Sequence, residues 1–225
     1  IKLINPIASQ MSVMRSTLIG GLVDTLVANL NRKQSRVRIF EIARVFLRDG
    51  EQVNQPERLA ALAYGSRAPE QWGQKAERVD FYDLKADLEA LLAPRVATFR
   101  KVNHPALHPG RAAEVVLDGQ VIGVLGELHP QWVQKYDLPA APVLFEVALD
   151  ALLTRAVVKG QPVSRFQPVR RDLALVMDES VEAGSLLAAF QALAAENFGE
   201  ITVAVPGRQA ASADRVQGEV ALYPR

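Results

Sequence analysis

The longest regular apolar pattern lies near the amino end of the chain. Leucines recur there at every fourth position, as Leu18, Leu22, Leu26 and Leu30. This spacing places side chains on one face of an α-helix. We predict a helix over residues 12–32, capped by Ser9 or Ser12. Gly20-Gly21 inside it costs about 1 kcal/mol per glycine relative to alanine, which favours a close approach of another element there.

A period of two follows in the stretch VRIFEIARVFL, residues 37–47. Alternate positions of a strand face opposite sides of a sheet. One side carries Glu41 among aliphatic residues, and the other carries Arg38 and Arg44 among Phe and Ile. Since both sides are mostly apolar, the pattern predicts a central strand covered on both faces.

Further elements follow from shorter patterns. They are a strand over 59–65, a helix over 80–94 with Asp80 as its N-cap, a hairpin over 114–126, and a strand running into a helix over 143–153. The hairpin turns at Asp118-Gly119, a strong signal for a type I′ turn. Strands joined by hairpins, with helices beside them, indicate an α+β domain on an antiparallel sheet that ends near residue 153.

The composition changes after that point. Residues 155–171 carry five basic residues, two prolines and no acid. We place a domain boundary here and predict one domain over 1–155 and another over 160–225. In the second domain the pattern predicts a strand over 172–178, a helix over 185–198 and a strand over 201–205.

Composition narrows the possible classes. The chain has 225 residues, of which 49% are hydrophobic and 23% charged, a mixture usual for globular proteins. The absence of cysteine excludes disulfides, thiolate nucleophiles and Cys-based zinc sites, and fits a reducing compartment. A net charge of +1 gives no global attraction to nucleic acid, so a site for it must come from local clustering. A chain that begins Ile-Lys-Leu, with no signal-peptide pattern, is expected to be a piece of a longer protein.

Several candidate sites have simpler explanations. Gly123 and Gly126 lack the rest of a phosphate-binding loop, so a hairpin strand explains them better. His104 and His108 have the spacing of a helical metal site, but each precedes a proline, which disfavours helix. We therefore predict no metal site. His129 also precedes a proline, and no catalytic triad is visible.

Two glutamates in apolar strands form the next candidate. Glu41 and Glu146 could be a buried pair of catalytic acids. The simpler alternative is an ion pair with Arg38, Arg44 or Arg111, which we favour because no nucleophile or base is indicated nearby. We predict no catalytic residue in this chain.

The basic stretch between the domains is a candidate RNA contact. Arg165, Phe166, Arg170 and Arg171 combine positive charges with an aromatic ring, which suits a phosphate backbone and a stacking base. A solvated charge run explains the same residues equally well.

Six stretches together carry a resemblance to a known family. They are NPIASQMSVMRSTL, RIFEIARVF, VDFYDLKADLEALL, HPGRAAEV, IGVLGELHP and SRFQPVRRDLALV. In this order they resemble the C-terminal part of bacterial phenylalanine–tRNA ligase β subunits, over roughly residues 3–178. The resemblance implies a class II synthetase-like domain that has lost catalysis, followed by a ferredoxin-like anticodon-binding domain.

The resemblance also implies a subunit assembly, its cofactors and its location. In the family, catalysis belongs to the α subunit, and two α and two β chains form a heterotetramer that charges tRNA(Phe) with phenylalanine. The resemblance implies ATP and magnesium as cofactors of the intact complex and no cofactor for this chain. It also implies that the complex works in the cytoplasm and does not bind a membrane. The comparable helix lies in a bundle between subunits, so the leucines Leu18, Leu22, Leu26 and Leu30 are predicted to lie at an interface.

The residues agree with lost catalysis. A class II site uses Arg-x-Glu and a later glycine-rich strand with an arginine, and these arginines hold ATP. Here Arg38 stands three positions before Glu41, and FEVALD (145–150) has neither the glycines nor the arginine. After Gly199 the chain departs from the family pattern, and about 65 residues are fewer than a ferredoxin-like unit needs.

Two other classes remain open from the sequence. One is a class II-like ligase of the biotin or lipoate type, which needs a glycine-rich adenylate loop or an acceptor lysine strand. The other is a free-standing RNA-binding regulator, which binds RNA without a synthetase partner.

Overall fold

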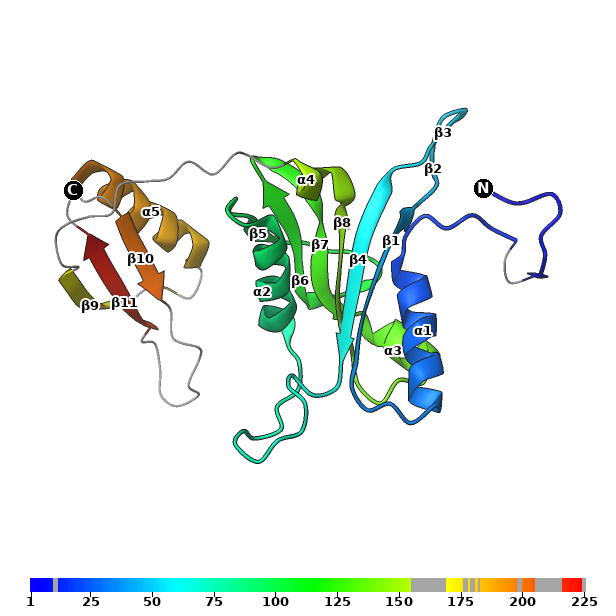
Figure 1. The fold of residues 1–225 in the computed structure, drawn as a ribbon. Coiled ribbons are helices and arrows are strands. Elements are labelled where there is room, and N and C mark those ends of the chain that lie inside the picture. Colours follow the sequence, from blue (N-terminus) through cyan, green and yellow to red (C-terminus); the bar gives the residue numbers. More distant parts are fainter. Residues whose placement is uncertain are drawn as a thin grey trace. The chain divides into compact units, whose positions relative to one another are not determined.

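The chain forms two compact units, Ile1–Val157 and Val158–Arg225. This computed structural model describes residues 1–9, 12–154, 169–175, 178, 181, 183–197, 200–204 and 216–223. Figure 1 shows the helices and strands of both units. The predicted identities of the two domains, class II-like and anticodon-binding, stay predictions at this point.

A six-stranded antiparallel sheet organises the first unit. In sheet order its strands are β1 (Val37–Arg44), β4 (Glu57–Tyr64), β8 (Val143–Ala148), β7 (Gln120–Leu128), β6 (Leu107–Leu117) and β5 (Thr98–Lys101). The short strands β2 (Leu47–Asp49) and β3 (Gln52–Asn54) pair separately. The predicted α+β class with an antiparallel sheet is confirmed.

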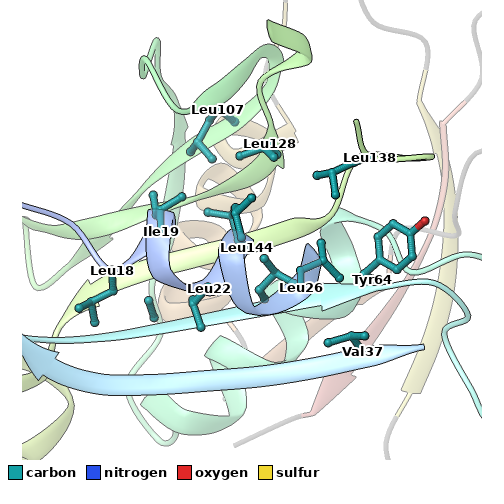
Figure 2. Packing of buried hydrophobic residues seen from close by; sticks show 14 of the residues in the cluster. Leu18, Ile19, Leu22, Leu26, Val37, Tyr64, Leu107, Leu128, Leu138 and Leu144 are labelled. Carbon is teal, nitrogen blue, oxygen red and sulfur yellow. The ribbon is translucent and has the colours of Figure 1, made fainter. Parts of the chain in front are cut away.

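Helices cover both faces of this sheet (Figure 1). α1 (Ile19–Asn31) and α3 (Pro130–Lys135) pack on one side, which we call the first face. α2 (Phe81–Leu92) and α4 (Leu149–Leu153) pack on the other, the second face. Each face has its own cluster of buried apolar side chains, and Figure 2 shows the cluster on the first face.

Two local predictions are confirmed by the backbone. The carboxylate of Asp80 accepts bonds from the amides of Tyr82 and Asp83, and Asp83 bonds back to the Asp80 amide, so α2 begins with a capping box. Asp118 and Gly119 both have positive φ, at 51° and 80°, as a type I′ turn requires.

The prediction for the start of α1 was wrong. The helix begins at Ile19, and its N-cap is Leu18, whose side chain makes no capping hydrogen bond. Residues 12–14 instead pair with the amino-terminal segment, through Leu3 N–H to Ser12 O and Met14 N–H to Ile1 O. Backbone groups used in this way cannot form the bonds of a first helical turn.

The close approach expected at Gly20-Gly21 is not made by the described residues of this chain, and an approach by a helix of another chain stays a prediction. Among the described residues, a Cβ on Gly20 would meet nothing within 4 Å. A Cβ on Gly21 would meet only Glu41 Oε2, at an ordinary contact distance of 3.6 Å.

β1 is an edge strand and not a central one. Its side chains alternate as predicted, but only those on the first face are covered. Phe40 and Ile42, on the second face, are 71% and 53% exposed. The apolar pattern was correct, but it could not show that α2 packs mainly over β7 and β8 and leaves Phe40 and Ile42 of β1 exposed.

The second unit contains β9 (Val169–Leu175), α5 (Ala183–Asn197), β10 (Glu200–Ala204) and β11 (Val216–Tyr223). The three strands form an antiparallel sheet in the order β10-β11-β9. β9 begins at Val169, earlier than predicted, so Arg170 and Arg171 belong to a strand and not to the linker. The sequence patterns did not predict β11, nor did they predict β2, β3, β5 and α3.

Candidate functional site

The two strand glutamates lie in one row of the sheet. Glu41 of β1 pairs in register with Ala60 of β4, and Ala60 pairs with Glu146 of β8. Residues directly opposite in a sheet share a face. Both carboxylates therefore lie on the first face, under the amino end of α1, with the small side chain of Ala60 between them.

Glu41 forms an ion pair, as the favoured alternative predicted, but its partner was not predicted. Arg15 Nη1 lies 2.5 Å from Glu41 Oε1, and Arg15 Nε donates to the carbonyl of Arg44 at 3.1 Å. Arg15 comes from the segment before α1. The carboxylate thus ties that segment to the edge strand.

The three arginines predicted as partners bind other acids. They form the pairs Arg38–Asp87 at 3.0 Å, Arg44–Glu57 at 3.5 Å and Arg111–Glu127 at 2.8 Å. Arg38 stands an odd number of positions from Glu41 and so lies on the opposite face, because strand side chains alternate. It bonds to α2 of that face. These three assignments were wrong because register and not sequence distance decides the partner.

Glu146 does not form an ion pair in the described part of the chain. Its Oε2 accepts from Thr17 Oγ1 at 2.6 Å and from the Leu18 amide at 2.7 Å, and the Ile19 amide donates to Thr17 Oγ1 at 3.2 Å. A carboxylate at a helix amino end meets unpaired amides and a favourable dipole. Glu146 therefore anchors α1 from the neighbouring sheet, and the ion pair predicted for it was wrong.

His104 lies close enough to Glu146 to feel its charge. Burial lowers the pKa of His104 from the usual 6.5, and the Glu146 carboxylate opposes part of that shift. The ring Nδ1 accepts a bond from the Ala106 amide at 3.3 Å. His104 is half-buried and serves as a neutral acceptor that shapes its own loop.

The other two histidines make the same local bond. His108 Nδ1 accepts from the Gly110 amide at 3.0 Å, and His129 Nδ1 accepts from the Gln131 amide at 3.1 Å at the start of α3. Each of the three histidines thus holds the backbone two residues ahead, across a proline. Across the described ranges, no three His, Asp or Glu side chains gather as a metal site would need.

Gly123 and Gly126 lie within β7, as the hairpin interpretation predicted. A Cβ on Gly123 would overlap the carbonyl oxygen of Glu146, and one on Gly126 would lie 2.7 Å from the carbonyl oxygen of Arg111. Glycine is needed here because neighbouring strands approach closely. No phosphate-binding role is required to explain it.

The leucine stripe of α1 is part of the core. Leu18, Leu22 and Leu26 are 0%, 3% and 0% exposed (Figure 2). Leu30 is partly buried against the same cluster. This burial accounts for the stripe without a second chain. A contact between α1 and another subunit stays a prediction, and it can use only the exposed side of the helix.

The predicted RNA-binding residues are placed only in part. Arg165 and Phe166 lie outside the described residues. Arg170 and Arg171 lie in β9, opposite Ala221 and Val220 of β11. Their role in binding stays a prediction.

The arrangement on the first face has one chemical consequence. Among the described residues, the side-chain hydrogen bonds of Glu41 and Glu146 are all made with the segment that leads into α1, through Arg15, Thr17 and Leu18. Each carboxylate is thus held by a partner from this chain, while the Glu41 side chain stays 32% exposed. Their geometry supports anchoring of a helix and not acid–base chemistry on a substrate.

Comparisons with known proteins agree on one family. Residues 1–149 match the family described as phenylalanyl tRNA synthetase beta chain CLM domain. The chain is similar to phenylalanine–tRNA ligase beta subunits from three bacteria. It is 63% identical to that of Chromobacterium violaceum over 203 residues, 57% to that of Dechloromonas aromatica over 192, and 56% to that of Neisseria meningitidis serogroup A over 205.

These matches cover most of this chain but a small part of each relative. They span 90%, 83% and 90% of the chain, and 26%, 24% and 26% of the three relatives. The chain thus spans about a quarter of the length of the curated relatives it matches. In the described ranges, no helix has both the length and the apolar character needed to cross a bilayer.

Proposed function

Because the chain belongs to the phenylalanyl-tRNA synthetase beta chain family, we propose that it is a non-catalytic part of a phenylalanine–tRNA ligase β subunit. In this role it supports assembly with the α subunit into an α₂β₂ complex and helps to hold tRNA(Phe) while the complex charges it with phenylalanine. ATP and magnesium serve the α subunit, and the whole assembly works in the cytoplasm.

One observation carries the non-catalytic role. In a class II site, the arginine and the glutamate of Arg-x-Glu share one face of a strand, because they stand two positions apart. Here Arg38 pairs with Asp87 on the second face, and Glu41 pairs with Arg15 on the first. No arginine–glutamate pair of this strand faces a common ligand, so the phosphates of ATP lack their charge partners.

The test is phenylalanine-dependent pyrophosphate exchange. The isolated chain should show none above the rate without enzyme, while the full complex containing the α subunit should show it. Exchange by the isolated chain would overturn the non-catalytic role. The same result would favour an independent ligase acting on a small acid.

The topology of the second unit supports an anticodon-binding role. β9 and β10 both pair antiparallel with β11, which lies between them, and α5 connects β9 to β10. This is the order of the first four elements of a ferredoxin-like βαββαβ unit. A second helix and a fourth strand are not among the described elements of this unit, so the proposal covers a partial domain.

We assign the contact with tRNA phosphates to Arg165, Arg170 and Arg171, with Phe166 as a base-stacking residue. Each phosphate contact releases counterions, so losing one should flatten the dependence of log affinity on log salt by about one unit. Salt titrations of tRNA affinity for Arg170→Ala and Arg171→Ala in the full complex test this. Arg48→Ala is the matched control, because Arg48 is exposed in β2 of the first unit. Slopes unchanged in both variants would show that Arg170 and Arg171 do not contact tRNA phosphates.

Assembly is tested by size-exclusion chromatography with and without the α subunit. A larger species containing both chains is expected. If the chain instead remains alone and binds RNA without α, it is a free-standing RNA-binding protein and the assembly role is wrong.

A further inference from the structure

Arg58 of β4 is a partly buried cation without a counter-charge beside it. Its Nε is buried and has no hydrogen-bond acceptor, and within the described ranges no other buried side-chain nitrogen or oxygen lacks a partner. The described residues also place no carboxylate oxygen within 4.0 Å of its guanidinium. Arginine stays charged at any ordinary pH, so the protein cannot relieve this situation by releasing a proton.

The register of the sheet explains why Arg58 has no partner in its own row. Arg58 lies on the first face with Ala60, because the two residues stand two positions apart in one strand. Its direct neighbours on the adjacent strands are Ala43 of β1 and Ala148 of β8. The nearest side chains of the sheet are therefore alanines, which have no polar atom to accept a hydrogen bond.

The nearest carboxylates of the sheet are held by other groups. Glu41 and Glu146 flank Ala60 in the next row, so each is a diagonal neighbour of Arg58. Glu41 is paired with Arg15, and Glu146 accepts hydrogen bonds from the start of α1. Both carboxylates thus bond to the segment that leads into α1 and leave the guanidinium of Arg58 without an ion pair.

Partial burial of this cation costs free energy. A charge taken out of water loses solvation, and a buried N–H without an acceptor adds to that loss. A water molecule that accepted the N–H would still leave the charge unbalanced. An anion beside the guanidinium would offset the cost, and its attraction is screened less on the buried side than in bulk water. The surroundings of Arg58 therefore favour a bound anion.

The free end of the guanidinium indicates which anion fits. Its two terminal nitrogens also lack a described partner, but they remain in contact with solvent. Two parallel N–H groups match the two oxygens of a carboxylate or of a phosphate. Glu41 and Glu146 in the next row repel every further negative charge. A singly charged carboxylate is therefore favoured over a doubly charged phosphate.

We propose that Arg58 is a binding site for a carboxylate group, which accepts hydrogen bonds from the two terminal nitrogens on the first face of the sheet. The carboxylate belongs either to a small molecule or to an acidic side chain of the assembled enzyme, and both sources present the same two oxygens. The inference rests on the surroundings of Arg58 alone and not on the proposed function.

The first test follows the Nε–H signal of Arg58 by NMR in the 225-residue chain. Arg58→Lys identifies the signal by its loss. Sodium acetate replaces sodium chloride stepwise at constant ionic strength. The Arg58 signal should shift and reach saturation, whereas the signal of Arg48, an exposed arginine of β2, should not. No saturating shift at Arg58, or an equal shift at Arg48, would overturn the proposal.

The second test compares the melting midpoints of the wild type and Arg58→Met, which keeps a similar volume without the charge. In chloride, Arg58→Met should melt at or above the wild type, because it removes an uncompensated charge. Acetate should raise the midpoint of the wild type and not that of Arg58→Met, since only the wild type binds it in the folded state. A lower midpoint for Arg58→Met in chloride, or equal effects of acetate on both chains, would contradict the site.

The source of the carboxylate is decided in the full-length β subunit co-assembled with α. If acetate still raises the midpoint of the wild-type complex and not that of the Arg58→Met complex, the site is open to a small molecule. If acetate acts on the isolated wild-type chain and not on the complex, an acidic side chain of the assembly fills the site. Either result supports a carboxylate at Arg58. A failure to assemble would overturn the proposed function and leave this site to the two tests on the isolated chain.

Discussion

At the residue scale, Glu146 and Glu41 show that one residue type in one row of a sheet serves two different contacts. Glu146 accepts a hydroxyl and a backbone amide, and Glu41 accepts a guanidinium. The hydrogen bonds of Glu146 are more enclosed than the ion pair of Glu41. Removing Glu146 would leave an amide at the helix start without a hydrogen-bond partner.

We predict that Glu146→Ala destabilises the chain by about 1–3 kcal/mol, since the Leu18 amide and the Thr17 hydroxyl lose their acceptor. Urea unfolding gives the free energy. Asp87→Ala is the control: it breaks the exposed pair with Arg38 and should cost at most about 1 kcal/mol. An equal or smaller loss for Glu146→Ala would mean that Glu146 does not anchor α1.

His104 predicts a pH dependence whose sign follows from its lowered pKa. Between that lowered value and 6.5, the unfolded chain holds a proton that the folded chain lacks. The free energy of unfolding therefore falls as the pH falls from 6.5 toward the pKa of His104 in the folded chain. Above pH 6.5 the stabilising contribution of His104 is complete.

The check on this sign is the unfolding free energy of His104→Asn and wild type at several pH values from 5 to 8. Asparagine can still accept from the amide two residues ahead. Its profile should be flatter than that of the wild type on the acidic side. Parallel profiles would show that His104 does not contribute.

At the element scale, the strands and helices were easier to predict than their places in the sheet. β7 is a clear example, because the sequence placed its glycines in a hairpin strand but could not show that they allow close pairing with β8 and β6. The α1 stripe is another, because its apolar face fits either a core or an interface.

We predict that Gly123→Ala destabilises the sheet by about 1–3 kcal/mol, the usual cost of forcing atoms into a packed region. The new Cβ would overlap the carbonyl of Glu146, so β7 or β8 has to move. Gly73→Ala is the matched control, because a Cβ there meets nothing within 4 Å among the described residues. Thermal unfolding of both variants measures the difference, and equal midpoints would contradict the packing seen here.

For α1, we expect Leu26→Asp to destabilise the isolated chain by more than about 3 kcal/mol, because it buries a charge at a position that is 0% exposed. It cannot test assembly alone. Ala28→Asp, on the exposed side of the same helix, should cost at most about 1.5 kcal/mol, through lower helix propensity and an acid near the carboxyl end of the helix. Circular dichroism during urea unfolding separates the two, and a folded Leu26→Asp chain would show that this leucine is not core.

At the scale of the whole molecule, the first unit contains both described clusters of buried side chains. Its stability should therefore not depend on the second unit. We predict that residues 1–157 fold alone, with amide NMR shifts matching those of the same residues in the full chain. Collapsed spectra for the shorter chain would show that the two units fold together.

The sequence by itself determined part of the local structure and the family. Alternation of side chains, the Asp80 cap and the Asp118-Gly119 turn depend on neighbours in the chain, so periodicity and turn chemistry were enough to predict them. The six stretches quoted above carried the family, because several motifs in one order are specific even where each motif alone is weak.

Only the tertiary structure decided which residues meet. Sheet order made β1 an edge strand, and the packing of the segment before α1 on the sheet brought Arg15 to Glu41 and Thr17 to Glu146. Arg15 stands 26 positions from Glu41, and Thr17 stands 129 from Glu146. Contacts at such separations depend on how strands pair and helices pack, and no pattern in a short window records that choice.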